Sequence, residues 1–249
     1  MPDDHNDLLA SLFRSGAQSQ LHGHVRTVHL QQGQVLAEPF EPMLQVYFPY
    51  SGAISFLVPL KAGQLVQTGV VGRGGVVGAL QALDAKVSPN RVVVQIPGRA
   101  AVVQAELLAE IVGDYPALRS LILSHEQFFL SEVQQSAACN AVHPVQQRVC
   151  KWILRMNDLV GMNVAMTQEL LAGMIGVRRT SVTAAAASLQ ADGIIKFRRG
   201  HIQIVDIERL KQSSCECYQT LRDYQRIVQP PGNYRTHDQS SPLGGMGAC

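Results

Sequence analysis

The sequence predicts an α+β protein in which a β-barrel, or jelly roll, is followed by one long helix and a small helical domain with a β-hairpin. Three observations predict this order. Short β-branched runs punctuated by glycine come first, a stretch rich in Leu, Ala, Glu and Gln follows, and three helical patterns then precede a final pair of alternating runs. The expected divisions are a barrel domain over 1–113, the long helix over 114–142, the helical domain over 143–224 and a disordered tail over 225–249.

Six short runs between Leu21 and Ala105 have the alternation and β-branching of strands. They are VRTVHL, QVLAEPF, LQVYFPYSGAISFLVPL, QLVQTGVVG, RVVVQIPG and AAVVQA. Because no long helical pattern separates them, they favour an antiparallel barrel or jelly roll over an alternating α/β sheet.

The long helix is expected to start at Pro116, because Asp114 is a suitable cap and proline is tolerated in the first turn. It should end before His143-Pro144, since proline disfavours helical geometry in the residue before it. Its apolar side chains recur at spacings of three, four and seven and form a broad stripe. We expect this stripe to pair with a second copy of the chain; the alternative is a helix packed only on its own domain. The residues expected at the dimer contact are Leu118, Leu121, Ile122, His125, Phe128 and Phe129.

Composition suggests a protein that does not enter membranes. The 249 residues are 46% hydrophobic, enough for two modest cores. The apolar runs are shorter than the roughly 18 to 20 residues that cross a bilayer, and the acidic start lacks a secretion pattern, so we expect a cytoplasmic protein.

The net charge is only +2, but residues 143–211 hold ten Lys and Arg against five Asp and Glu, whereas residues 1–142 hold eight against eleven. The basic excess is confined to one segment.

The most informative segment begins at Thr167, a suitable cap for a helix that buries Leu170, Leu171, Met174 and Ile175. Ala172 is small where a second helix must cross closely, and Gly176 tolerates a turn with positive φ. The next helix buries Val177, Val182 and Ala185, and the residues that remain outward at its N-terminal end are Arg178, Arg179, Thr180, Ser181 and Thr183.

Three helices followed by a hairpin predict a winged helix-turn-helix, and this outward edge suits the major groove of DNA. Arginine can form two hydrogen bonds with guanine, hydroxyl groups can reach phosphates or base edges, and a helix N-terminus favours phosphate. Arg198 and Arg199 at the hairpin tip are placed to bind phosphate, and Thr167 and Gln168 complete the expected DNA contacts. The alternative is a three-helix bundle with a solvated basic face.

The chain resembles the Crp/Fnr family of cyclic-AMP receptor and fumarate-nitrate regulator proteins over about Leu21 to Tyr218. The resemblance depends on GRGGVVGAL at the end of the roll, on the long linking helix and, most specifically, on MTQELLAGMIGVRRTSVTAAAASLQADGIIKFRRG. It implies a homodimer joined along the long helix, a recognition helix in each half of a near-palindromic operator, and RNA polymerase as a candidate partner.

One departure from the family concerns the operator. The common recognition core is Arg-Glu-Thr/Ser-Val-Ser/Thr-Arg, and the matching positions here are Arg179, Thr180, Ser181, Val182, Thr183 and Ala184. Only the first of the three base-reading charges is present. The operator is therefore expected to differ from the best-known family site.

A second departure concerns the effector. Members that bind cyclic nucleotides use a Gly-Glu pair on the ribose and an Arg-Ser pair on the phosphate, where this chain has Gly78-Ala79 and Arg91-Val92. The lost hydrogen bonds would be worth roughly 1 to 3 kcal/mol each. Gly78, Ala79 and Arg91 thus mark the expected effector pocket, but cyclic AMP is not the expected effector.

Cysteine usage indicates free thiols and no metal or other cofactor. No cysteine precedes Cys139, which argues against the iron-sulfur mode of the family. Metal binding and oxidation remain open for two sets of residues, which are Cys139 with His143 and Cys150, and Cys215 with Cys217. Neither set has the spacing of a zinc site. Packing or surface cysteines are the expectation.

Two further classes of function remain as alternatives to a DNA-binding regulator. One is an effector-binding or protein-binding module that uses the barrel and the long helix without contacting DNA. The other is an enzyme, for which the sequence offers no nucleophile-base pair and no catalytic residue. GRGGVVG lies between strands and lacks the lysine and helix of a phosphate loop.

Overall fold

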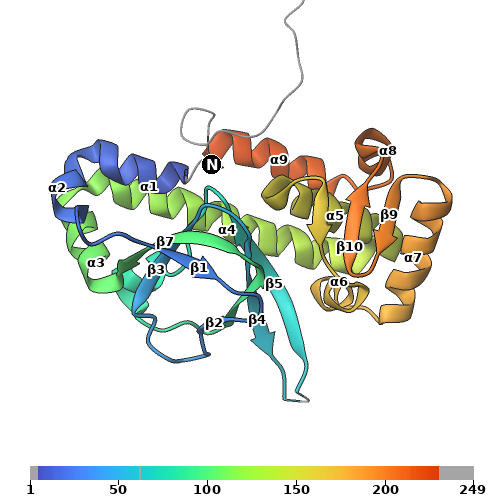
Figure 1. The fold of residues 1–249 in the computed structure, drawn as a ribbon, viewed down its shortest axis with the longest axis horizontal. Helices are drawn as coiled ribbons and strands as arrows, with labels where there is room; N and C mark the ends of the chain where they lie inside the picture. Colours follow the sequence, from blue (N-terminus) through green and yellow to red (C-terminus); the bar gives the residue numbers. More distant parts are fainter. Residues whose placement is uncertain (1–4, 62, 230–249) are drawn as a thin grey trace, which may run out of the picture.

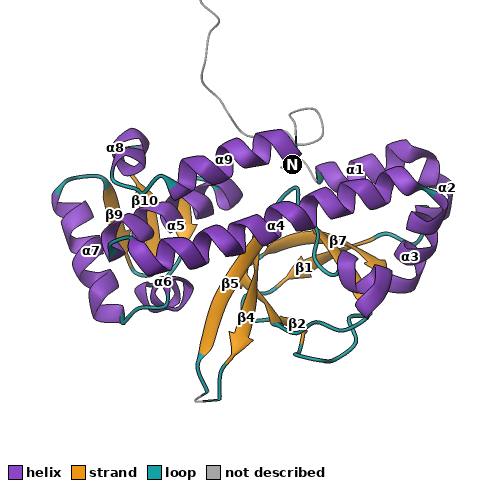
Figure 2. Ribbon diagram, turned by 180° about the vertical axis from the view of Figure 1, so that it is seen from behind, coloured by secondary structure: helices purple, strands orange, loops and turns teal. Residues whose placement is uncertain are grey.

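The computed structural model, which describes residues 5–61 and 63–229, contains a β-sheet domain and a helical domain that lie along one long helix (Figure 1). That helix, α4 (Pro116–Val142), has 27 residues and contacts both parts (Figure 2). The predicted α+β organisation is confirmed. None of the described helices is both long enough and apolar enough to span a bilayer.

Strands of the described chain form two antiparallel sheets that pack as a jelly roll. One sheet has the order β1-β7-β3 and the other the order β2-β6-β4-β5. Ile54, Val92 and Val102 belong to the apolar core of the roll. The two sheets do not close into one barrel, so the jelly-roll form of the prediction is the correct one. The bounds are β1 (Arg26–Leu30), β2 (Val35–Ala37), β3 (Gln45–Pro49), β4 (Ala53–Pro59), β5 (Leu65–Gly72), β6 (Arg91–Ile96) and β7 (Gly98–Gln104).

Helical segments before β1, between β5 and β6, and after β7 cover one end of the roll, and those before β1 are absent from the sequence prediction. Their bounds are α1 (Asp7–Leu12), η1 (Phe13–Ala17), α2 (Gln18–Leu21), η2 (Gln81–Ala85) and α3 (Ala105–Asp114). Asn6 is buried and fixes α1, because its side chain accepts a hydrogen bond from the Leu9 amide and donates to the carbonyls of Pro49 and Gly75. Leu8 and Leu12 then pack in one apolar cluster with Leu108 and Ile122.

Most of the residues predicted at the dimer contact instead face their own chain. Leu118, Ile122, His125 and Phe128 are buried, and Leu121 and Phe129 are partly buried. The Phe129 ring lies so close to Gly69 of β5 that a Cβ added there would be 2.5 Å from it. Within one chain, the roll, α1 and the C-terminal helices together cover most of this stripe.

The helical domain continues from α4 after His143-Pro144. Its elements are α5 (Val145–Val160), β8 (Asn163–Ala165), α6 (Gln168–Ile175), α7 (Arg179–Ala191), β9 (Ile195–Arg198), β10 (His201–Ile204), α8 (Ile207–Gln212) and α9 (Cys217–Val228). β8 joins the predicted hairpin in a sheet of order β8-β10-β9. Helix α9 returns to pack on α4 and α5, so the start of the segment predicted as a disordered tail is helical. The rest of that tail, residues 230–249, lies outside the described residues.

Candidate nucleic-acid interface

Helices α6 and α7 form a helix-turn-helix with well-defined ends. The Thr167 hydroxyl caps α6 by accepting a hydrogen bond from the Leu170 amide at 3.1 Å. Gly176 ends α6 with φ +64°, a left-handed conformation that favours glycine, and the following Val177 amide donates to the Ala172 carbonyl at 3.1 Å. The predicted capping residue and turn glycine thus have the geometry of a tight interhelical turn.

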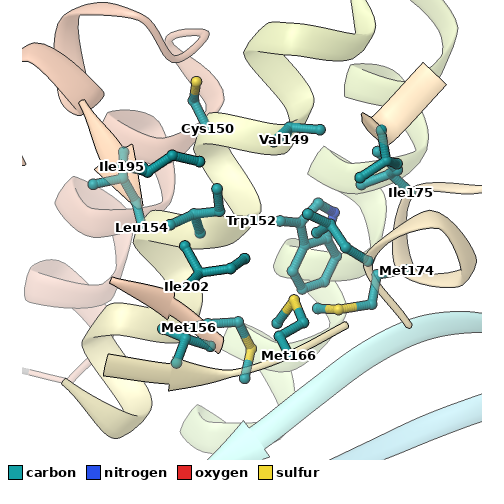
Figure 3. Close-up of a cluster of buried hydrophobic side chains, with 14 of the residues drawn as sticks. Val149, Cys150, Trp152, Leu154, Met156, Met166, Met174, Ile175, Ile195 and Ile202 are labelled. Carbon is teal, nitrogen blue, oxygen red and sulfur yellow. The ribbon is translucent and has the colours of Figure 1, made fainter. Parts of the chain in front are cut away.

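The core beneath this motif comes from α5, the small sheet and both helices (Figure 3). Trp152 of α5 lies among Met166, Met174 and Ile202 in the close-up. A buried arginine on the same helix, Arg148, donates to the Ile175 carbonyl at the end of α6. α5 therefore holds the turn by both apolar packing and a hydrogen bond to a carbonyl that the helix end leaves unpaired.

The N-terminal edge of α7 is turned toward solvent. Arg178, Arg179, Thr180 and Thr183 are exposed and Ser181 is half-buried, whereas Val182 between them is completely buried. The predicted split of this helix into an outward polar edge and an inward apolar face is therefore present.

The start of α6 and the hairpin lie beside this edge. The Thr183 hydroxyl donates to the Gln168 side chain at 2.7 Å, and the Arg179 guanidinium lies 3.9 Å from Glu169. At the hairpin tip Arg199 has φ +46° and Gly200 has φ +81°, and a Cβ added to Gly200 would lie 3.3 Å from the Thr167 side chain. These contacts link α6 to α7 and the hairpin to α6, so the predicted DNA-contacting segments are neighbours. Arg198 and Arg199 are exposed at the tip.

Three residues of this surface are missing from the sequence prediction. Lys196 and His201 are exposed on β9 and β10, and Glu169 pairs with Arg179. The alternation of the hairpin could have identified the first two, since Ile195 and Ile202 are buried and their sequence neighbours must face outward. Glu169 could have been found from its place in the first turn of α6.

The expected effector residues have different surroundings. Ala79 is buried in the cluster formed with α1 and α3, whereas Val92, the neighbour of Arg91, is buried in the core of the roll. Arg91 pairs with Glu38 at 3.2 Å, and both side chains are more than a third exposed. Gly78 has φ +90° and lies against Met43 and the Gln45 carbonyl.

Replacing the turn glycine, Gly176→Ala, is expected to destabilise the domain by about 1–2 kcal/mol, because alanine is strained in the left-handed region. Gly173→Ala in the same helix is the matched control. A Cβ added there meets nothing within 4 Å, and alanine is the better helix former, so this variant should be unchanged or up to about 1 kcal/mol more stable. Urea unfolding followed by the fluorescence of Trp152, the only tryptophan, measures both. Equal losses in the two variants would contradict the turn assignment.

Comparisons with known proteins agree with this geometry. Residues 147–213 match the family of Crp-like helix-turn-helix domains. FixK2 from Bradyrhizobium japonicum matches with a TM-score of 0.67 and 17% identity, over 77% of this chain and 98% of that one. The c-di-GMP-responsive global regulator CLP from Xanthomonas campestris matches with a TM-score of 0.62 and 17% identity, over 76% and 98% of the two chains.

A CRP/FNR-family transcriptional regulator from Thermus thermophilus matches with a TM-score of 0.61 and 20% identity, over 78% of this chain and 98% of that one. A comparison with curated proteins finds no matching sequence. At these identities the structural matches establish the shared fold, and the matched domain accounts for the helix-turn-helix. The chain therefore carries a Crp-like helix-turn-helix domain, within a fold that is similar to the folds of these regulators.

Proposed function

We propose that the protein is a transcription regulator that binds double-stranded DNA, with the N-terminal edge of α7 in the major groove. The observation that carries this proposal is the exposure of Arg178, Arg179, Thr180 and Thr183 on one edge of α7, beside the hairpin tip. The Crp-like domain over residues 147–213 supports the same function.

Each part of the surface has a separate task in this proposal. Arg179 reaches a guanine edge, while the hydroxyls of Thr180 and Thr183 contact bases or phosphates. Arg198 and Arg199 bind the phosphate backbone, which adds affinity and salt dependence but no sequence preference. Glu169 lies 3.9 Å from the Arg179 guanidinium in the free protein, and DNA would replace that contact.

A homodimer joined along α4 would place two such edges on one operator. The side of α4 that faces away from its own chain carries Leu123, 47% exposed, and Leu130, 55% exposed, with the exposed Ala137 seven residues further on. A seven-residue repeat of apolar side chains is the pattern of a helix pair. In this proposal, the stripe replaces the one predicted from the sequence. The two-fold symmetry of a dimer formed through it implies a near-palindromic operator.

The remaining finer points follow from this proposal. We infer action in the cytoplasm, where bacterial DNA lies, with RNA polymerase as a candidate partner once the operator is bound. The apolar surroundings of Ala79 and Val92 support an effector other than a cyclic nucleotide. A module without DNA contact is disfavoured, since it leaves the exposed arginine edge of α7 without a role.

Selection of bound fragments from random duplex DNA tests the proposal. We expect enrichment of a two-fold-symmetric site whose half-sites are about 10 base pairs apart, centre to centre. Leu130→Arg in the stripe on α4 should shift the protein toward monomer in sedimentation and weaken binding to the full site. Failure to enrich any sequence, with a folded protein, would refute DNA recognition.

A further inference from the structure

Four metal-ligating side chains from two segments of the sequence meet where the helical domain joins α4. Cys139 lies in the last turn of α4, His143 is the residue that follows the helix, and Cys215 and Cys217 precede and begin α9. Their Sγ and imidazole nitrogen atoms all lie within 4.8 Å of one another. Along the sequence these residues form separate sets, with Cys150 grouped with Cys139, whereas the fold brings the two pairs together without Cys150.

We propose that Cys139, His143, Cys215 and Cys217 form a tetrahedral site for a thiophilic divalent metal ion, with Zn²⁺ the best fit. Three sulfurs and one nitrogen are a ligand set of structural zinc sites. Zinc bond lengths of about 2.3 Å to sulfur and 2.0–2.1 Å to nitrogen place tetrahedral ligands about 3.6–3.8 Å apart. The Sγ atoms of Cys139 and Cys215 are 3.5 Å apart, and Cys217 Sγ is 3.5 Å from His143 Nδ1, so little movement is needed.

Groups around the four ligands fit the same assignment. His143 Nε2 lies 3.1 Å from a carboxylate oxygen of Glu216, which orients Nδ1 toward the sulfurs as in carboxylate–histidine–zinc arrangements. Gln135 donates an N–H to Cys217 Sγ at 3.1 Å, a contact that favours a thiolate. The three cysteines are buried and His143 is partly exposed, so a path for the ion runs past the imidazole.

The charge of the site is also compensated. Three thiolates, a neutral imidazole and a divalent ion sum to one negative charge, which is costly to bury alone. The buried Lys151 donates to Ser136, one turn of α4 before Cys139, and so places a positive charge near the site. Metal at this site would join the end of α4 to the start of α9 and so fasten both ends of the helical domain.

Metal analysis of the full-length protein under reducing conditions tests this proposal. We expect one zinc ion per chain after dialysis, and on exchange with Co²⁺ the intense visible bands of a tetrahedral thiolate site. Glu216→Gln removes only a group that orients a ligand and should weaken metal affinity about 10- to 100-fold, and Cys217→Ser and His143→Gln should each weaken it more than that. Circular dichroism confirms that the variants are folded.

Two matched controls use the remaining cysteines. Cys150 is buried near the cluster and burial raises the pKa of its thiol to about 12, and Cys249 lies outside the described residues. Cys150→Ser and Cys249→Ser should both keep full metal content. Absence of metal in the folded wild-type chain would overturn the site, as would equal loss in Cys150→Ser and Cys217→Ser. A Cys139–Cys215 disulfide in a protein that binds no metal when reduced would assign the cluster to oxidation instead.

Discussion

Arg179→Ala is expected to weaken binding to the selected operator by roughly 5- to 150-fold, because a bidentate arginine–guanine contact contributes about 1–3 kcal/mol. The loss should be concentrated at one base pair of each half-site, where the variant no longer discriminates between bases. Within the described residues, the Arg179 guanidinium pairs only with Glu169, at 3.9 Å, so its removal should leave folding intact. Fluorescence anisotropy with the operator and its single-base variants measures both effects.

Two other arginines serve as controls for this result. Arg199→Ala at the hairpin tip should weaken binding to all sequences alike and reduce the salt dependence by about one phosphate contact. Arg226 is exposed on α9 and, in the part of the chain that the structure describes, pairs with Asp223 of the same helix, so Arg226→Ala should leave DNA affinity unchanged. If Arg179→Ala and Arg226→Ala bind the operator equally well, α7 is not the recognition helix.

The helix-turn-helix was predictable because its signals are local. A capping threonine, a turn glycine and alternating buried positions all lie within a few turns of the chain, and Thr167, Gly176 and Val182 take the predicted places. The strands of the roll were predictable for the same reason. Each depends on alternation that a single segment carries by itself.

The orientation of α4 was not predictable in the same way. Its apolar residues occur nearly all round the helix, so spacing alone cannot tell which stripe the chain covers and which it leaves exposed. Here the roll covers Ile122, while α9 approaches the side of Phe128 and Cys139. The side with Leu123 and Leu130 is the one that remains exposed.

The cysteine cluster could not be predicted without knowing where the chain runs after the hairpin. Cys139 and Cys215 are separated by the entire helix-turn-helix domain, and only the return of α9 onto α4 brings their sulfur atoms together. No residue pattern in either segment encodes that return. A ligand set divided between distant segments therefore looks, in the sequence, like two incomplete pairs.

The helical domain is also tied to α4 by a buried ion pair between Glu132 of α4 and Arg155 of α5. Arg155 donates Nε to one carboxylate oxygen at 2.6 Å and Nη2 to the other at 2.9 Å, a bidentate arrangement. Glu132 is 2% exposed, and the Arg155 guanidinium also lies 5.8 Å from the Phe128 ring. Neither charge has ready access to water, so each depends on the other.

Glu132→Leu should therefore destabilise the protein by about 3–5 kcal/mol, since it leaves the arginine charge buried without its partner. A value near the lower end of that range is expected, because Asp158 also attracts Arg155 while remaining hydrogen-bonded to Tyr218 and paired with Arg222. Glu132→Leu/Arg155→Met removes both charges and should recover most of the loss. Urea unfolding followed by Trp152 fluorescence gives the three free energies. If the double variant is no more stable than Glu132→Leu, the stability lost in Glu132→Leu comes from altered packing of α4 on α5 and not from a buried charge without a partner. The ion pair would then not stabilise the contact between α4 and the helical domain.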